Sequence, residues 1–566
     1  MVLRSYSLVV GAVVVMAACG GGSKKATQPG AANGGGGTQG SGGPVGIPAV
    51  PNPGECPEMG MDPANTYYVC DCGEGSAEGC VPGDDANPGS KESPFKTYEK
   101  ASATFNEFLP GGGTVAFCRG GVFDVPMGKK WANSSCKPDA PCVARDYVPD
   151  WFDGDEAPLP VIKVAAGYGF DIEEGGNANA DGGYRFLNLD LRGNPEKPGF
   201  FFYNDVDDVL ICGVSIDGFS IGVQIAGQNT PDPDSDGRSS NIVIQNSSIT
   251  NCPSQGFLGA CDGCGIAYTR FENNGFGTAV LNHHIYFGSE SETFGMFAVG
   301  NDLYRNTIVN GSCAATSLVV HGMFTDLLIE GNTVREDKGK ADLGCWGITA
   351  DPGHTSKEFF KNLVMRNNTV INLGGVSIGV TACQNCLIEN NLVIQEQDGG
   401  GVLISVPNKG VAPDDTPLDA VTVRNNTLYA KTNGNVTGIK LGEEGDGHSV
   451  TNNVFVYEGT GIDSCFDYRD LPDSAYVERN NNVCYGVLGT TRWTSATEDL
   501  AAFQSASGHD ADSLVADPLF VSVTEPYDFT PAENSPLLDA ALPGPADDLN
   551  GETRGSKPDI GAFERK

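Results

Sequence analysis

The sequence predicts an all-β fold: a single-stranded right-handed parallel β-helix, a solenoid, with a small N-terminal cap and a disordered Gly-rich tether. Three observations predict it. A short unit, apolar-x-Asn-Asn-x-apolar, recurs along the chain, short apolar segments lie between its copies, and helical periodicity is nearly absent. Each coil of a solenoid is stabilised by its neighbours, so a chain of 566 residues can form one such body.

The recurring unit marks the coils. Its copies lie at 365–370, 388–393, 423–428 and 450–455, and more loosely at 211–216, 244–249, 271–276, 299–304 and 329–334. Their fourth positions are 214, 247, 274, 302, 332, 368, 391, 426 and 453. Successive markers are 23 to 36 residues apart, which predicts one coil per step.

Each copy has the physical properties of a strand followed by a sharp corner. Apolar residues at alternate positions place one side of the strand inward, and asparagine tolerates the left-handed backbone of a corner. Asparagines stacked in successive coils are expected to form a hydrogen-bonded ladder. A second kind of strand is expected at 222–225, 265–268, 347–350, 376–380 and 438–441.

The N-terminus predicts export. Arg4 precedes an apolar run at 8–15 that is too short to span a bilayer, and small residues lead to Cys19. This arrangement resembles the lipobox of bacterial lipoproteins, which implies a signal peptide at 1–18, a lipid on Cys19 and a place in the bacterial envelope, at the outer membrane or cell surface. A plain secretory signal peptide is the alternative. The Gly-rich stretch 19–54 is expected to be a disordered tether.

Three regions are expected after the tether. They are a Cys-containing N-terminal cap that leads into the β-helix (55–154), the coils (155–490) and a C-terminal cap or anchor-like region (491–566). A helix is predicted within 93–108, because Ala101, Phe105 and Phe108 are spaced to share one apolar face. Such a helix suits the end of a solenoid, which needs a cap.

The cysteines predict disulfides. Without Cys19, 17 of the 18 cysteines remain, so at least one thiol has no partner within the chain, and an exported protein favours disulfides. Local bridges are expected in three places: among Cys56, Cys70, Cys72 and Cys80 in the cap, between Cys136 and Cys142, and between Cys465 and Cys484. The pairs Cys261/Cys264 and Cys383/Cys386 have a spacing that also suits zinc, a less favoured alternative.

The charge restricts the partners. With 35 basic and 72 acidic residues the net charge is −37, so the chain lacks the basic footprint that nucleic acid requires. A polyanionic ligand is unfavourable unless calcium bridges it. Asp232, Asp234 and Asp236 precede a glycine at a spacing suited to a calcium loop, although the closing glutamate of an EF-hand is missing. Calcium there and a solvated acidic loop are equally open.

A family resemblance concerns the architecture. The coils over 155–490 resemble those of pectin-lyase-like proteins, and the segments 83–97 and 110–120 are similar to the opening of that group. The ending, with Asp517-Pro-Leu-Phe520 and Asp559-Ile-Gly-Ala-Phe-Glu564, resembles the tail of choice-of-anchor Q β-helix proteins. The resemblance implies a fold and leaves the reaction open, because function depends on sites placed on a fold.

Polar residues of the central coils are candidates for a site. If their strands stack in one sheet, His284, Tyr286, His321 and Asp351 share its outward face, about 5 Å apart from coil to coil. His284, His321 and Asp351 would be catalytic, with a histidine moving a proton, and Tyr286 would hold a sugar. A solvated polar face is the alternative.

Two basic residues are candidates for substrate binding. Lyases of the resembled fold use a lysine or arginine as base beside bound calcium, and Arg270 and Lys440 lie near strand ends. No lyase signature surrounds them, and the paired aspartates and Gly-His-Gly pattern of polygalacturonase-like hydrolases are absent from the sequence.

Two functions remain open. The favoured one is a surface-exposed lipoprotein that binds polysaccharide, or presents itself to envelope glycans, without catalysis. The alternative is a carbohydrate-active enzyme, a polysaccharide lyase or a glycoside hydrolase, that uses the outward face of the central coils. The expected partners are a glycan and, through the lipid on Cys19, a membrane; the oligomeric state is left open.

Overall fold

The computed structural model describes residues 54, 56–152, 156–173, 181–227, 238–353, 357–408, 414–461, 464–468, 471–489 and 492–566. The chain divides into two units, 1–43 and 44–566, and all described residues belong to the second unit. Cys19 and the acidic loop with Asp232, Asp234 and Asp236 lie outside the described residues.

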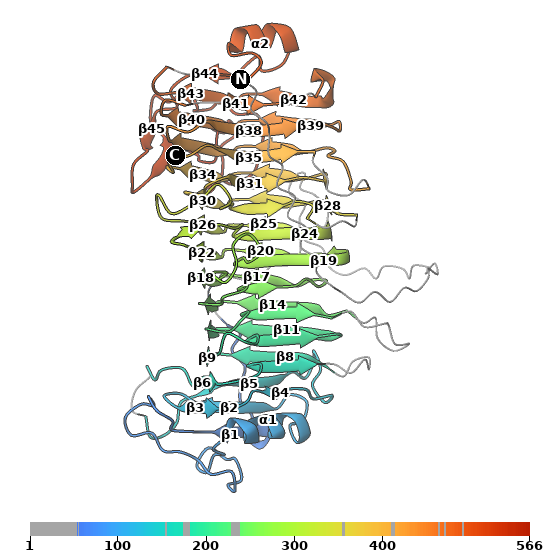
Figure 1. The fold of residues 1–566 in the computed structure, drawn as a ribbon, viewed down its shortest axis with the longest axis vertical. Helices are drawn as coiled ribbons and strands as arrows, with labels where there is room; N and C mark the ends of the chain where they lie inside the picture. The colour runs from blue at the N-terminus through green and yellow to red at the C-terminus, as the bar shows by residue number, and fades with distance from the viewer. Residues whose placement is uncertain are drawn as a thin grey trace, which may run out of the picture. The chain divides into compact units, whose positions relative to one another are not determined.

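The described strands stack into three long parallel sheets, here called A, B and C (Figure 1). Sheet A contains β1 (Thr66–Val69), β2 (Thr114–Cys118), β5 (Cys142–Tyr147), β8 (Asp181–Leu187), β11 (Val206–Cys212), β14 (Ser240–Gln245), β17 (Gly265–Ala267), β20 (Phe297–Val299), β25 (Leu328–Glu330), β29 (Val364–Arg366), β33 (Leu387–Glu389), β36 (Thr422–Arg424), β39 (His448–Thr451) and β42 (Tyr476–Asn480).

Sheet B follows sheet A in each coil. It contains β3 (Val122–Val125), β6 (Val161–Val164), β9 (Asp190–Arg192), β12 (Ser215–Asp217), β15 (Ser248–Thr250), β18 (Arg270–Glu272), β21 (Asp302–Tyr304), β26 (Thr333–Arg335), β30 (Thr369–Ile371), β34 (Leu392–Gln395), β37 (Thr427–Lys431), β40 (Val454–Glu458), β43 (Val483–Gly486) and β44 (Leu514–Val515).

Sheet C completes each coil. It contains β4 (Lys129–Lys130), β7 (Phe170–Glu173), β10 (Phe200–Tyr203), β13 (Val223–Ala226), β16 (Phe257–Leu258), β19 (Ile285–Phe294), β24 (Leu318–Thr325), β27 (Ile348–Ala350), β31 (Val376–Val380), β35 (Gly401–Pro407), β38 (Val436–Gly442) and β41 (Ser464–Asp467), with β28 (Phe359–Lys361) and β32 (Cys383–Gln384) beside it. Two short antiparallel pairs, β22 (Ile308–Val309) with β23 (Ser312–Cys313) and β45 (Phe520–Ser522) with β46 (Asp528–Pro531), lie outside the stack.

The predicted right-handed parallel β-helix is confirmed. The stacked strands extend beyond 155–490, because β1 to β5 lie within 55–154 and β44 lies after 491. Inward side chains form continuous columns: in sheet C, Ile285, Leu318 and Ile348 pair in register and are fully buried. Each coil therefore shields the apolar surface of the next from water.

The predicted asparagine ladder is confirmed at the corner between sheets A and B. Its amides bond from one coil to the next at 2.9–3.1 Å, through Asn301, Asn332, Asn368, Asn391, Asn426, Asn453 and Asn482. All seven are buried, so the ladder satisfies polar groups that would otherwise be costly inside the protein.

Two assignments from the repeat were wrong. The marker at 274 belongs to a later corner, and the ladder passes instead through the hydroxyl of Thr269, which accepts from the Ser247 amide at 3.4 Å. The marker at 302 is displaced by one residue, because Asn301 carries the ladder. The segment 265–268, expected among the second kind of strand, forms β17 of sheet A, whereas the other four segments lie in sheet C.

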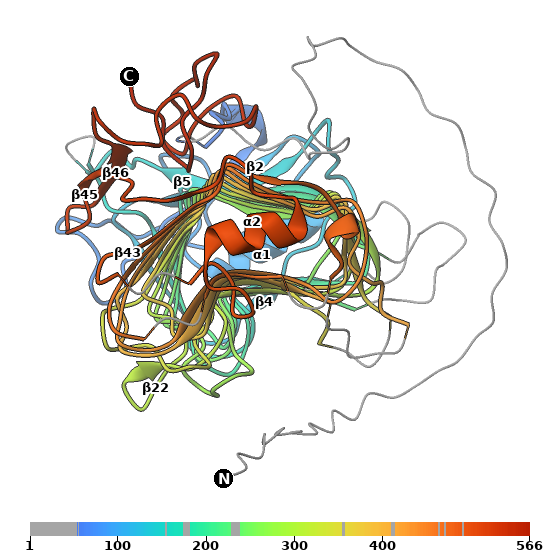
Figure 2. The same cartoon turned by 90° about the horizontal axis from the view of Figure 1, so that it is seen from above.

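A helix lies at each end of the stack, and the view along the stack shows both across its cross-section (Figure 2). The predicted N-terminal helix is α1 (Tyr98–Glu107); its Phe105 ring packs 4.8 Å from the buried Trp131. Phe108, expected on the apolar face, is 61% exposed because the helix ends just before it. At the other end, α2 (Leu500–Ser507) places Phe503 on Tyr468. No helix of the described residues has the length and apolar character needed to cross a membrane.

Eight disulfides and one buried free cysteine, Cys252, account for the described cysteines. The expected Cys136–Cys142 and Cys465–Cys484 bridges are confirmed, and Cys261–Cys264 and Cys383–Cys386 are disulfides rather than zinc ligands. Among the cap cysteines Cys72 bonds to Cys80. Cys70 bonds to Cys118 within the region 55–154, and Cys56 bonds to Cys212, which joins the cap to the coils. The Cys313–Cys345 bridge was not anticipated.

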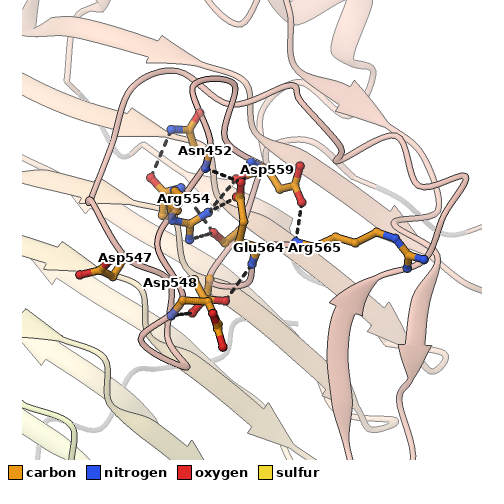
Figure 3. Close-up of polar contacts among 12 residues, drawn as sticks. Asn452, Asp547, Asp548, Arg554, Asp559, Glu564 and Arg565 are labelled. Carbon is orange, nitrogen blue, oxygen red and sulfur yellow. Dashed lines mark hydrogen bonds and ion pairs between the residues drawn. The ribbon is translucent and has the colours of Figure 1, made fainter.

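The C-terminal segment, residues 516–566, folds back along the outside of sheet B. Phe529, Leu537 and Phe563 pack on outward apolar side chains of β34, β37 and β40. Arg554 fixes the last turn: its guanidinium donates to the Asn390 side chain and to the Gly561 carbonyl, and it pairs with Glu564 at 3.3 Å (Figure 3). The segment is therefore held by both apolar burial and a buried polar cluster.

Candidate functional site

Three of the predicted site residues come together on the outward face of sheet C. Tyr286 on β19 and His321 on β24 have ring centroids 5.5 Å apart. Asp351 directly follows β27, and its carbonyl oxygen lies 2.5 Å from Nδ1 of His321. Since a carbonyl only accepts, Nδ1 of His321 carries a proton and donates it to this oxygen.

Two glycines leave room for these rings. Gly288 pairs in register with His321, and a Cβ at Gly288 would lie 2.4 Å from the Tyr286 ring. A Cβ at Gly353 would lie 2.7 Å from the His321 ring. Any larger residue at either position would displace a ring, so the local sequence sets the orientation of the pair.

His284 does not face outward as predicted. Its ring is fully buried, with Nδ1 3.1 Å from the Asn274 amide and Nε2 3.1 Å from the Tyr304 carbonyl. Burial lowers the pKa of His284 to about 3. The alternation fails here because His284 lies before the first residue of β19, where the chain is still at a corner. A buried ring without access to solvent cannot contact a saccharide.

His283, not singled out in the sequence, lies next to Tyr286. The two ring centroids are 5.5 Å apart, and Nδ1 of His283 is 2.8 Å from the Thr316 carbonyl. Burial, together with a smaller effect of the nearby His321, lowers the pKa of His283 to about 4. His283 is therefore neutral at pH 7, and its ring packs beside that of Tyr286.

A second residue missed in the sequence is Glu358, which is fully buried. Its carboxylate accepts from the Gly353 amide at 2.7 Å, and its own amide donates to the Asp415 carboxylate at 2.8 Å. Burial, followed by the charges of Glu358 and Asp351, raises the pKa of Tyr286 to about 12. Tyr286 thus keeps its proton over the physiological range and can act as a hydrogen-bond donor. No local pattern around 358 marks a strand or motif, so the sequence offered no signal for it.

Two buried hydroxyls complete the surroundings. Oγ1 of Thr349 and Oγ1 of Thr381 make no hydrogen bond among the described residues. Thr349 pairs in register with Val319 of β24, and the Thr381 amide bonds to the strand beside Asp351. Unsatisfied buried polar atoms are rare and costly, and they often mark positions where a ligand or water completes the bonding.

The two basic candidates lie elsewhere. Arg270 is on β18 of sheet B and pairs with Glu272, so it faces a different side of the coil. Lys440 is on sheet C but in β38, four strands beyond β24, a separation of about 19 Å at about 4.8 Å per strand. Neither residue joins the Tyr286 cluster, and a role for them in substrate binding stays a prediction.

A cavity of about 1750 Å³ lies away from this cluster. It lies between the C-terminal segment and the corner of sheets A and B, and its lining includes Tyr268, Glu330, Tyr527 and Asp547. No histidine, lysine or arginine lines it. We favour the Tyr286 cluster as the functional site because it combines outward rings, histidines and carboxylates, the groups that bind and transfer protons.

Metal binding has little support among the described residues. Two groups have suitable spacing, Cys70, Cys72 and Cys80, and Cys313, Glu336 and Cys345. All five cysteines are in disulfides, which removes the thiolates that a soft metal requires. The calcium prediction at Asp232, Asp234 and Asp236 concerns residues outside those described.

Comparisons with known proteins give structural neighbours and no sequence relatives. No family model matches the chain, and no curated protein matches it. Similar solved structures include the A-module of mannuronan C-5 epimerase AlgE6 from Azotobacter vinelandii (16% identity, 66% of this chain and 91% of that chain, TM-score 0.43). Pectate lyase Pel9A (16%, 90% and 98%, TM-score 0.38) and XylC in complex with xylose (9%, 88% and 98%, TM-score 0.44) are further examples.

Proposed function

We propose that the outward face of sheet C around Tyr286 and His321 binds a saccharide chain. The observation that carries the proposal is the cluster itself: a protonated tyrosine, a histidine held through its Nδ1–H bond and the backbone of Asp351 lie together at the surface. Hydroxyl-rich ligands are recognised by such mixed donors and acceptors beside an aromatic ring. The Tyr286 ring is half-buried, so one part is held by the protein and the rest faces outward.

The expected saccharide is uncharged. Carboxylates of Asp351 and Glu358 act on Tyr286, and the whole chain carries a net charge of −37. A polyanionic chain would be repelled both at long range and at the site. We therefore expect a neutral polysaccharide to bind more tightly than an anionic one at low salt.

Affinity measurements on a small panel test this proposal. The probes are xylan and α-1,3-glucan as neutral chains, with pectate and mannuronan as anionic chains, each with and without a calcium chelator. Tyr286→Ala and His321→Ala should each weaken binding of a neutral probe about tenfold or more, because truncation of a residue at the centre of a binding site typically costs this much affinity. Tyr304→Ala, which removes a partly exposed aromatic side chain on sheet B, is the matched control. Unchanged affinity in the Tyr286 variant, or no binding to any probe, would refute the proposal.

Catalysis at the same cluster is the second candidate. Its support is the pairing of two rings at 5.5 Å: the Tyr286 hydroxyl retains a proton to donate, and the imidazole of His321 is held in place through its Nδ1–H bond to the Asp351 carbonyl. A lyase or a hydrolase would use such a pair. Incubation with the same panel should then release unsaturated or reducing-end products, and Tyr286→Phe should abolish turnover while binding persists. If no product forms from any probe, catalysis at this cluster is contradicted and only the binding proposal stands.

The envelope location remains part of the proposal. The N-terminal pattern supports lipidation of Cys19, which would hold the coils at a membrane through the tether. Cys19→Ser should shift the protein from the membrane fraction to the soluble fraction, whereas a processed plain secretory protein would fractionate identically with either residue.

A further inference from the structure

The outward column of sheet C that contains Tyr286 has an open half and a closed half. Register pairs join Phe201, Gln224, Leu258 and Tyr286 across β10, β13, β16 and β19. All four side chains are partly exposed. A ligand lying on Tyr286 can therefore extend along the column toward β10.

On the other side of Tyr286 the same column is covered. Val319 is 2% exposed and Thr349 is 1% exposed, and the following positions, Gly379 and Ser405, are also buried. A side chain that points outward from a sheet and has no exposure must have other atoms above it. The surface beyond Tyr286 therefore offers no continuation of the open face.

Two loop ends meet at this boundary. Glu358 links them, since its carboxylate accepts from Gly353 and its backbone carbonyl accepts from the Thr416 amide at 3.2 Å. The Glu358 amide also donates to Asp415. These bonds hold a wall beside Asp351, at the position where the open column ends.

The open half carries a row of aromatic rings at its far end. Tyr168 and Phe201 stack with centroids 4.5 Å apart and an interplanar angle of 8°, and Phe201 and Tyr203 follow at 5.8 Å and 17°. Tyr203 is 37% exposed. Stacked rings cover each other's faces, so Tyr203, the exposed ring, offers the flat apolar surface to the C–H face of a pyranose ring, and Phe201 supports it from behind.

An orphaned polar atom lies next to this row. Asp171 pairs in register with Phe201, and its Oδ1 is buried without a hydrogen-bond partner among the described residues. The ammonium of Lys197 lies 5.1 Å from the Tyr168 ring centroid. A donor and an acceptor therefore flank the apolar rings, as a ligand with both C–H faces and hydroxyls requires.

We propose that this face takes the end of a saccharide chain: the terminal sugar rests on Tyr286 and His321, and the chain runs over Leu258 and Gln224 to the aromatic row. The inference rests on the proposed function. Three strand spacings separate β10 from β19, about 14 Å, which a short oligosaccharide spans and a monosaccharide does not. Binding in the middle of a chain would need an open surface on both sides of Tyr286, and the burial of Val319 and Thr349 removes one side.

Chain-length dependence tests end recognition. The probes are xylan and α-1,3-glucan, each fractionated into a long and an about tenfold shorter pool, both long enough to span the open column. At equal mass, a protein that binds chain ends should show about tenfold higher apparent affinity for the shorter pool, because that pool contains about ten times more ends. A protein that binds internal segments should show the same affinity per unit mass for both pools.

The aromatic row is tested with Tyr203→Ala and Phe201→Ala. Each should weaken binding of oligosaccharides about three- to tenfold, the effect of losing one aromatic contact, without changing the weak binding of a monosaccharide. Tyr203 is exposed, so its variant keeps the test valid if the Phe201 variant fails to fold. Tyr304→Ala on sheet B is again the control.

The outcomes separate the two proposals. If Tyr286→Ala weakens binding but affinity per unit mass is independent of chain length, end recognition is wrong and saccharide binding stands. If Tyr203→Ala and Phe201→Ala both bind oligosaccharides like the unmodified protein, the aromatic row is not part of the site. If Tyr286→Ala has no effect, the proposed function itself fails.

Discussion

The asparagine ladder makes a quantitative prediction for Asn391→Ala. The Asn391 side chain donates to Asn426 Oδ1 and to the Met365 carbonyl, and its Oδ1 accepts from both the backbone and the side-chain amide of Asn368, all at 3.0 Å. Four hydrogen bonds are lost, at about 1 kcal/mol each, and the buried Asn368 backbone N–H is left without its acceptor. We therefore expect the free energy of unfolding to fall by about 3–5 kcal/mol.

Equilibrium unfolding in urea, without reductant, measures this change. Circular dichroism and intrinsic fluorescence should report one transition, because separate transitions in a solenoid would mean that coils unfold in parts and the free energy is not defined by one midpoint. Asn550→Ala is the matched control: Asn550 is exposed, and its variant should change stability by no more than about 0.5 kcal/mol. If Asn391→Ala lowers the free energy of unfolding by less than about 1 kcal/mol, the reasoning is refuted. Such a small loss would mean that water, or a local rearrangement of the coils, replaces the hydrogen bonds of the Asn391 side chain.

Two further predictions concern buried charge. Glu336 is 4% exposed, and burial raises its pKa to about 8, so its contribution to stability is complete below about pH 4.5 and is lost as the pH rises through 8. Between pH 5 and pH 9 the unmodified protein should therefore lose on the order of 4 kcal/mol of unfolding free energy relative to Glu336→Gln. If thermal or urea unfolding gives the two proteins the same dependence of stability on pH, this prediction is wrong. Arg554→Met should destabilise the C-terminal segment by about 3–5 kcal/mol, because it leaves the buried carboxylate of Glu564 without its ion-pair partner. The readout is faster hydrogen exchange in β45 and β46, and Arg192→Met, which breaks an ion pair at the surface, is the control. Unchanged protection of β45 and β46 in the Arg554 variant would disprove this role.

The coils could be predicted because their signals are local. Alternating apolar residues identify the inward side of a strand, and asparagine identifies a corner, without knowledge of distant contacts. The one misplaced coil illustrates the limit of this reasoning: Thr269 supplies a hydroxyl where other coils supply an amide, so the ladder passes through a residue that the repeat does not mark.

The site was predictable only where stacking alone decides it. Tyr286, His321 and Asp351 come together because their strands are neighbours in one sheet. The position of Arg270 on sheet B could not be predicted, because alternation says which side of a strand faces inward and does not say which of three sheets the strand joins. Glu358 and Asp415 meet through two loops whose separation in sequence is 57 residues, a contact that no periodicity encodes.

The paired asparagines of the repeat have two separate roles, which the sequence pattern alone does not distinguish. The second asparagine of each pair points inward and forms the ladder. The first has a left-handed backbone, with φ of 53–58° at Asn390, Asn425, Asn452 and Asn481, and faces outward. There its amide meets the C-terminal segment: Asn390 donates to the Asp547 carbonyl at 2.7 Å, Asn481 donates to the Ala540 carbonyl at 2.8 Å, and Asn452 exchanges two bonds with the Leu542 backbone.

This division of roles has a consequence for ligand binding. The outer asparagines and the apolar side chains of β34, β37 and β40 are occupied by the protein's own C-terminal segment, which Figure 2 places outside the coils on the side of β43. Sheet C lies on another side of each coil, and its outward column from Phe201 to Tyr286 is partly exposed. A corner covered by the chain itself cannot also receive a polymer, so this part of the surface is closed to the extended ligand that we propose for sheet C.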